Sequence, residues 1–321
     1  MKTLAIGRIC QDEFYLVRAA KNRIASTKLT ADYIGRQFGG SVFSVAKMLC
    51  EAGVDCTFMS GMAEGDFLSC QTPDFVKIIK TPTTPRSFIY IKDQYKLDRI
   101  CSVGESKEEK IQPSAELLDW VEKLEKPRRL VYDLRQAPLT KAVLDRMYHK
   151  VELTVLDPGS TAFYTEDEEE MQEIADVISH SDVICAGSDF YEHYAHYSRL
   201  SDYFSYPLFQ SAKLLIATLP DGRNIFATRD FCLTVSRLNQ LSIGNTMGAG
   251  DAFRGAFLSA WKESRDGMTY EAVLAGAKRA VAAATLKIED KRPLPQMPTA
   301  NEISAFCERL ALRITKDDSM L

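Results

Sequence analysis

Several features that define other classes of protein are missing from this 321-residue sequence. No apolar run approaches the roughly 20 residues that a membrane-spanning helix needs. The eight cysteines include no Cys-x-x-Cys pair, and a net charge of −4 provides no basic field for nucleic acid. No Gly-x-x-x-x-Gly-Lys-Ser/Thr motif is present, which excludes a P-loop as a phosphate site. We therefore expect a cytoplasmic protein with reduced thiols that binds neither membranes nor nucleic acids.

Short β-branched segments alternate with longer helical patterns along the chain, and this alternation predicts an α/β fold built from parallel βαβ units. No internal repeat or low-complexity linker interrupts it. The expected strands are Thr3–Ile9, Cys56–Ser60, Arg129–Tyr132, Leu153–Leu156, Val183–Ala186 and Leu214–Thr218. The expected helices are Val42–Ala52, Ala115–Leu124, Lys141–His149, Glu168–Ser179, Ala252–Lys262, Tyr270–Ile288 and Asn301–Leu312.

The most informative segment is a glycine-rich turn, residues 244–251, that opens a predicted helix. Gly248 and Gly250 tolerate positive φ and let a ligand approach the backbone closely. A helix N-terminus adds free N–H groups and the positive end of the helix dipole, so an anion is favoured there. Asp251 lies in the first turn and brings a carboxylate beside the anion-binding groups. The spacing alone also fits ordinary turn chemistry, which remains the alternative.

The octamer Gly-Asn-Thr-Met-Gly-Ala-Gly-Asp and its continuation Ala-Phe-Arg-Gly-Ala-Phe resemble the signature of the ribokinase-like (PfkB) carbohydrate kinases. The resemblance implies one ribokinase-like domain over residues 1–321, with three layers, a mainly parallel central sheet and a small β lid. It also implies a kinase that uses ATP and Mg²⁺ to phosphorylate a hydroxyl of a small carbohydrate. Asp251 would be the catalytic base, and Gly248, Ala249 and Gly250 would form an anion hole for the γ-phosphate.

A second glycine pair, Gly39-Gly40, precedes another predicted helix, with Ser41 as its expected cap. On its own, the pair could be no more than a capped helix start. In the resembling family, a Gly-Gly pair and an asparagine at the place of Ser44 line the sugar site, and an aspartate shortly after the first strand binds sugar hydroxyls. The resemblance therefore implies that Asp12, Gly39, Gly40 and Ser44 bind the acceptor.

Two segments do not fit a parallel sheet. Residues near 13–36 are polar and irregular in pattern, and residues 86–102 alternate as in a hairpin. In the resembling family, strands inserted at these places form a lid over the sugar, which would exclude water from the reaction. An ordinary edge hairpin is the alternative for the second segment. A homodimer through the lid is one assembly that this arrangement would allow.

The sequence also departs from the family pattern. Asn245 stands where the family usually has aspartate, and residues 187–192 (GSDFYE) replace the Asn-x-x-Glu that helps to hold magnesium through water. Residues 218–222 (TLPDG) stand where Thr-Leu-Gly-x-x-Gly usually borders the nucleotide. No residue is assigned as a metal ligand. We nevertheless assign four residues to the nucleotide site: Asn245, Thr246, Thr218 and Gly222.

These departures leave two other functions open. A degenerate family member could bind a sugar or nucleotide as a sensor without transferring phosphate efficiently, and the altered metal motif supports that alternative. A nucleoside kinase could use the same scaffold. The sequence does not name the acceptor, because the lid and pocket side chains decide specificity.

Overall fold

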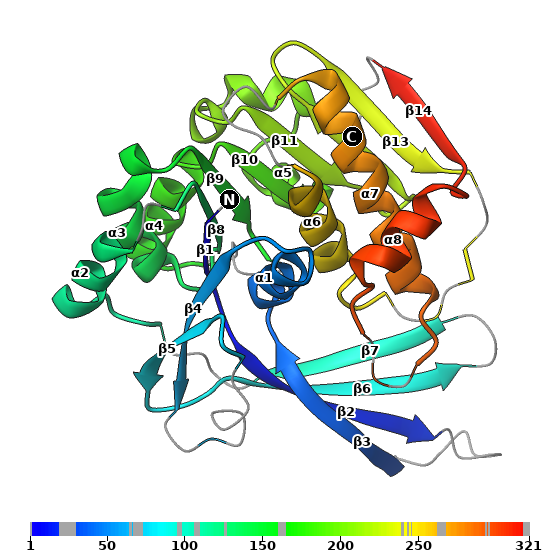
Figure 1. The fold of residues 1–321 in the computed structure, drawn as a ribbon, viewed down its shortest axis with the longest axis horizontal. Coiled ribbons are helices and arrows are strands. Elements are labelled where there is room, and N and C mark those ends of the chain that lie inside the picture. The colour runs from blue at the N-terminus through cyan, green and yellow to red at the C-terminus, as the bar shows by residue number, and fades with distance from the viewer. Residues whose placement is uncertain are drawn as a thin grey trace.

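The computed structural model of the protein describes residues 2–18, 30–63, 66, 73–94, 98–105, 110–124, 127–159, 165–238, 241–242, 244, 246–261, 268–292, 294 and 296–316. A ten-stranded sheet forms the middle layer, in the order β14-β13-β12-β11-β10-β9-β8-β1-β4-β5 (Figure 1). Its strands are β1 (Thr3–Ile6), β4 (Cys56–Ala63), β5 (Val76–Thr81), β8 (Arg129–Asp133), β9 (Leu153–Asp157), β10 (Val183–Gly187), β11 (Leu214–Thr218), β12 (Arg223–Ala227), β13 (Cys232–Arg237) and β14 (Leu312–Lys316).

The sheet is mainly parallel, as the sequence predicted. All neighbouring pairs from β5 across to β11 are parallel, whereas β12, β13 and β14 extend the β11 edge as antiparallel strands. Every expected strand is present. The sequence analysis did not predict β5, β12, β13 or β14.

Helices cover both faces of this sheet (Figure 1). Along β1, Leu4 and Ile6 join the core on one face and Ala5 joins the core on the other, because successive strand side chains point in opposite directions. The first face packs against α2 (Ala115–Lys123), α3 (Ala137–Met147), α4 (Glu168–Ser179) and α5 (Ser188–Tyr194). The second face packs against α1 (Ser41–Glu51), α6 (Ala249–Ala260) and α7 (Tyr270–Glu289), and α8 (Ala300–Cys307) packs on α7.

A second sheet of four strands crosses one end of the molecule, below α1 and α8 in Figure 1. Its order is β3-β2-β6-β7, formed by β2 (Cys10–Arg18), β3 (Thr30–Gly39), β6 (Arg86–Gln94) and β7 (Asp98–Glu105). The segment near 13–36 is therefore not irregular throughout, because most of its described residues pair as β2 and β3. A small core around Phe14, Ile89 and Ile91 also contacts Met247 and Leu294, so the second sheet packs against the glycine-rich turn.

Several helix boundaries differ from the sequence prediction. The helix expected over Lys141–His149 begins four residues earlier, at Ala137, and ends at Met147. Two further differences have a clear physical cause. The helix expected over Asn301–Leu312 ends at Cys307, and Leu312 begins β14, where the β-branched Ile314 and Thr315 pair with the open edge of β13. The helix expected from Ala252 begins at Ala249, because Gly248 in the left-handed region supplies the N-cap three residues earlier. Asp251 is consequently the third residue of α6.

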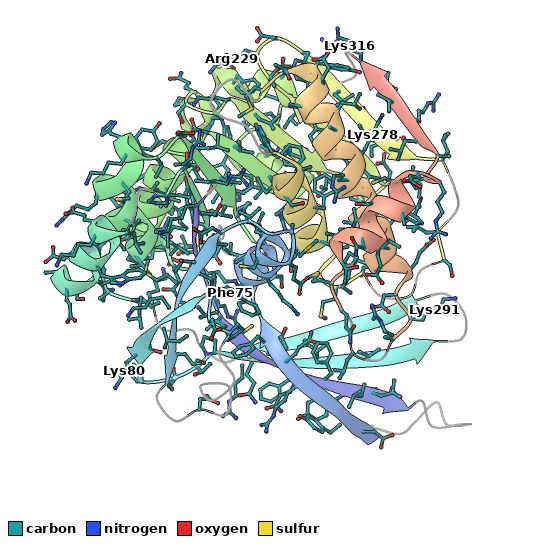
Figure 2. All side chains as sticks on the ribbon, in the orientation of Figure 1. Phe75, Lys80, Arg229, Lys278, Lys291 and Lys316 are labelled. Carbon is teal, nitrogen blue, oxygen red and sulfur yellow. The ribbon has the colours of Figure 1, made fainter. Side chains whose placement is uncertain are left out.

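The surface carries the charge that the composition predicts. Figure 2 shows side chains such as Lys80, Arg229 and Lys316 at the outer edges of the molecule. Among the residues that the structure describes, no helix is both long and apolar enough to cross a membrane.

Candidate active site

The glycine-rich turn and the start of α6 form the centre of the site. Gly248 adopts φ 74°, and a Cβ at this position would lie 3.0 Å from Met297 Cε and 3.4 Å from Lys287 Cε. A side chain would therefore be strained and crowded, which explains the glycine. The N–H of Ala249 donates to the carbonyl of Thr246 at 3.1 Å. The other first-turn N–H groups, those of Gly250 and Asp251, have no acceptor within the helix.

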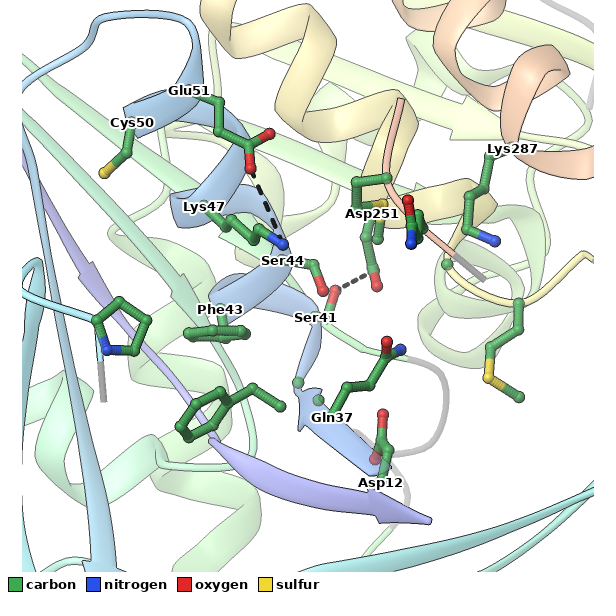
Figure 3. Close-up of a pocket in the computed structure, with 18 of the residues that line it drawn as sticks. Asp12, Gln37, Ser41, Phe43, Ser44, Lys47, Cys50, Glu51, Asp251 and Lys287 are labelled. Carbon is green, nitrogen blue, oxygen red and sulfur yellow. Dashed lines mark hydrogen bonds and ion pairs between the residues drawn. The ribbon is translucent and has the colours of Figure 1, made fainter. Parts of the chain in front are cut away.

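Asp251 is held by contacts from two other elements. Ser41, the first residue of α1, has its hydroxyl 2.5 Å from Asp251 Oδ1 (Figure 3). The same hydroxyl hydrogen-bonds Asp157 Oδ2 at the end of β9. Ser41 was expected to cap α1, and that expectation is wrong: Gly40 is the N-cap residue and no side chain caps this helix. The two carboxylates draw the Ser41 side chain away from its own helix end.

Arg254 supplies the positive charge of this cluster. Its Nη1 atom lies 3.1 Å from Asp157 Oδ2 and 3.4 Å from Asp251 Oδ1, and its Nε donates to the carbonyl of Cys185 at 3.1 Å. Burial raises the pKa of Asp251, while the charge of Arg254 opposes that rise. Burial alone would lower the pKa of Arg254, but the carboxylates of Asp157 and Asp251 outweigh it and raise this pKa.

Asp12 approaches the same region from β2. Its Oδ1 atom accepts a hydrogen bond from Cys10 Sγ at 3.1 Å, and burial raises the pKa of Asp12 to about 6. Gly39 on β3 makes room for this side chain, since a Cβ there would lie 2.1 Å from Asp12 Oδ2. Gly40 has φ 115°, and a Cβ there would lie 2.1 Å from the Arg8 carbonyl oxygen. Both glycines are therefore required by close contacts.

Two cavities of about 880 and 520 Å³ meet at these residues. Asp12, Gly40, Ser41, Gly248 and Asp251 line both of them. In Figure 3, Asp251 reaches the larger cavity from α6, and Asp12 reaches it from the second sheet. Further lining residues of the larger cavity include Gly39, Phe43, Ser44, Phe75 and Lys287; those of the smaller include Gly187, Asp189, Thr218, Gly250 and Arg254.

The structure does not bring every assigned residue to these cavities. Gly222 lies in the turn between β11 and β12, where its N–H donates to the carbonyl of Leu219, and it lines neither cavity. Thr246 is an exposed residue of the glycine-rich turn. Asn245 lies outside the described residues. Glu192 is exposed on α5 and lines neither cavity, whereas Asp189 lines the smaller one.

Sequence reasoning missed four charged residues of the site. Asp157 follows a buried strand, Arg254 stands one helical turn after Asp251, and Asp189 opens the helix that follows β10. Lys287 lies on the alanine-rich helix α7 and is only 2% exposed. A lysine among buried alanines was the one available signal, because lysine is almost never fully buried without a reason.

Comparison with known proteins agrees with this architecture. Residues 149–300 match the model of the pfkB family carbohydrate kinases, and no curated protein matches the chain. Ribokinase from Giardia lamblia has the same fold, with a TM-score of 0.72 and 16% identity over 96% of this chain and 99% of that chain. Fructokinase with bound ATP from Xylella fastidiosa has a TM-score of 0.70 and 16% identity, and the match covers 96% of this chain and 98% of that chain. The nucleoside kinase of Methanocaldococcus jannaschii has a TM-score of 0.66 and 17% identity, and the match covers 96% of this chain and 98% of that chain. The shared fold, and the family match over the segment that contains the glycine-rich turn, make this chain similar to the ribokinase-like (PfkB) carbohydrate kinases.

Proposed function

We propose that this protein transfers the γ-phosphoryl group of ATP to a hydroxyl of a small carbohydrate. The observation that supports the proposal is the position of Asp251 where the two cavities meet. Phosphoryl transfer depends mainly on holding donor and acceptor in line and on stabilising charge. A carboxylate at the junction can touch an acceptor hydroxyl on one side, while the start of α6 faces the phosphates on the other.

Each side chain then has a chemical task. The Asp251 carboxylate takes the proton of the acceptor hydroxyl as that oxygen attacks the phosphorus. The N–H groups of Gly250 and Asp251, with the positive end of the α6 dipole, stabilise the charge on the transferred phosphoryl group. Asp12 accepts hydrogen bonds from acceptor hydroxyls, and the backbone at Gly40 lets the acceptor lie close to the chain.

The phosphates also need positive charge. Lys287 is a buried cation beside Gly248 and lines the larger cavity. A bound magnesium ion would supply further positive charge to offset that of the phosphates. Among the described residues, no three or more His, Cys, Asp and Glu side chains cluster in a way that could hold a metal ion. Asp189, whose carboxylate lines the smaller cavity, would help to hold the ion there, because carboxylate oxygens are ligands that magnesium prefers.

A nucleoside is the second candidate acceptor. Phe43 and Phe75 line the larger cavity, with ring centroids 5.9 Å apart and planes inclined by 21°. Aromatic faces favour stacking of a planar base as well as the apolar face of a sugar. The aromatic wall is thus compatible with either acceptor, and only an assay distinguishes them.

Release of ADP from ATP and Mg²⁺ with a panel of sugars and nucleosides tests the proposal. We expect transfer to at least one sugar. Asp251→Asn should keep its fold and ligand affinity but lose about 10²-fold or more in turnover, the scale of general-base catalysis. Turnover with nucleosides alone would establish the second candidate. Ligand-induced melting shifts without any transfer would replace the kinase by a binding protein.

A further inference from the structure

One hydroxyl group lies between two carboxylates in the site. Ser41 Oγ is 2.5 Å from Asp251 Oδ1 and also hydrogen-bonds Asp157 Oδ2. The two aspartates come from different elements, β9 and α6, and only 2% of the Asp157 side chain is exposed. The proposed function uses Asp251 alone, so the second carboxylate needs a separate explanation.

A count of hydrogens shows what this arrangement requires. A serine hydroxyl has one hydrogen and can donate it to only one carboxylate. An ionised carboxylate only accepts hydrogen bonds. The second contact is therefore a hydrogen bond only if that carboxyl carries a proton and donates it to Ser41 Oγ. We propose that Asp251 and Asp157 share one proton through the Ser41 hydroxyl, so that Asp157 and Ser41 set the protonation state of the base.

The charges around the cluster favour one shared proton. Arg254 Nη1 contacts both carboxylates, at 3.1 and 3.4 Å, and Arg254 brings one positive charge for the two. Two ionised carboxylates would leave an uncompensated negative charge in a poorly solvated place, which is costly. Lys287 on α7 favours ionised Asp251, whereas Asp251 and the Asp12 carboxylate on β2 repel each other. The smaller cavity that Asp251 lines is also lined by two arginines and two carboxylates, Arg8, Arg135, Asp133 and Asp189.

The shared proton has two positions. In one, Asp251 holds it and donates to Ser41 Oγ, while the Ser41 hydrogen points to Asp157. In the other, the Asp251 O–H bond has broken as a new Ser41 O–H bond formed, and the original Ser41 hydrogen has moved to Asp157 Oδ2. Only the second form leaves Asp251 ionised and able to accept the proton of the acceptor. This step rests on the proposed function, but the sharing of the proton does not.

Carboxyl ¹³C NMR of aspartate-labelled, ligand-free protein tests the sharing without any activity. Resonances are assigned with Asp157→Asn and Asp251→Asn. We expect one proton to be held between the two carboxyls, and we expect the titration of Asp251 to move to lower pH in Asp157→Asn. Two carboxyls that are both ionised at pH 7 and titrate independently would overturn the proposal. If the two carboxyls titrate together but the protein transfers phosphate to no acceptor, the shared proton is supported and the proposed kinase function is refuted.

The pH profile of kcat/KM then tests the role in the reaction. Ser41→Ala removes a hydrogen bond that favours ionised Asp251, so the acidic limb should move to higher pH by about one unit. Asp157→Asn removes a charge that raises the pKa of Asp251, so the limb should move to lower pH by a similar amount. A merely structural role would lower activity without such opposite shifts. Limbs that stay fixed, or that move in the same direction, would contradict the proposal.

Two matched variants complete the test. Ser41→Thr keeps a hydroxyl on the same carbon, and the acidic limb of its kcat/KM profile should lie at the wild-type pH. Ser259→Ala removes a hydroxyl that, among the described residues, hydrogen-bonds within α6 to the carbonyl of Ala256, and it should leave the acidic limb in place. A shift in Ser259→Ala as large as that in Ser41→Ala would show that the limb reports general damage to the fold.

Discussion

Acceptor binding should weaken steeply below pH 6, because Asp12 must be ionised to accept hydrogen bonds from two hydroxyls at once. Burial raises the pKa of Asp12 from 3.8 to about 6, although hydrogen bonds from Cys10 and Ser87 oppose the rise. At about 1.4 kcal/mol per unit, this shift corresponds to roughly 3 kcal/mol in favour of the protonated carboxyl. Ionisation of Asp12 at neutral pH therefore comes at a cost in stability.

The sign of the effect follows from the direction of the shift. A carboxyl whose pKa is higher in the folded than in the unfolded state stabilises the fold below pH 3.8, and this stabilisation is lost as the pH rises through 6. Asp12→Asn should therefore be more stable than wild type at pH 8, by up to about 3 kcal/mol. Acceptor affinity of the wild type should fall about tenfold per pH unit between pH 6 and 4. The variant should bind the acceptor more weakly and show no such dependence.

Calorimetric binding of the acceptor between pH 4.5 and 8 measures the affinity. The titration is best performed in Asp251→Asn, because that background removes the titration of the base itself. Thermal melts of wild type and Asp12→Asn at pH 8 measure the stability. An acceptor affinity that stays flat down to pH 4.5, or a lower melting temperature for Asp12→Asn, would refute the reasoning from burial.

Two further predictions follow from the same site. Gly40→Ala should lower the free energy of unfolding by about 2–4 kcal/mol, because φ 115° is strained for alanine and the new Cβ would meet the Arg8 carbonyl oxygen. In the control Gly53→Ala, φ is 77° and nothing lies within 4 Å of the new Cβ, so only the backbone strain remains. Denaturant unfolding should therefore show a smaller loss of stability for Gly53→Ala than for Gly40→Ala. Lys287→Met should weaken a non-hydrolysable ATP analogue about tenfold more than ADP, because the lost cation lies beside Gly248, in the turn that we propose binds the γ-phosphate. Equal losses for both nucleotides by calorimetry would place Lys287 away from that phosphate.

Six of the parallel strands could be predicted because they are short, largely apolar segments that the fold buries on both faces. Residues 183–186 and 214–217 are fully buried, and no polar residue interrupts them. The missed strand β5 is only partly buried at the edge of the sheet, and its two isoleucines are flanked by lysines. The missed strand β14 is mostly exposed and begins where a helical pattern ends. Edge strands depend on a neighbour that offers hydrogen bonds, and a single sequence does not show that neighbour.

The charged cluster around Asp251 could not be predicted in the same way. Ser41 lies 116 residues from Asp157 and 210 residues from Asp251 in the sequence, and only the folded chain brings their side chains together. Spacing pointed to Asp251 as a candidate because this residue directly follows the glycine-rich turn in the sequence. Arg254 stood within the same motif, but nothing local indicates that it pairs with a carboxylate on another strand.

Glycines marked the site because their requirement is local. A Cβ at Gly39 would meet the Asp12 carboxylate, one at Gly40 would meet a backbone carbonyl, and Gly248 needs positive φ to start α6. At each of these positions the backbone passes close to another group or turns tightly, and this local constraint requires a glycine in the sequence. In contrast, the sequence does not distinguish a buried arginine such as Arg254 from an exposed one. The backbone-defined part of the site can therefore be found by motif, whereas the charges that tune Asp251 become visible only when distant elements are placed side by side.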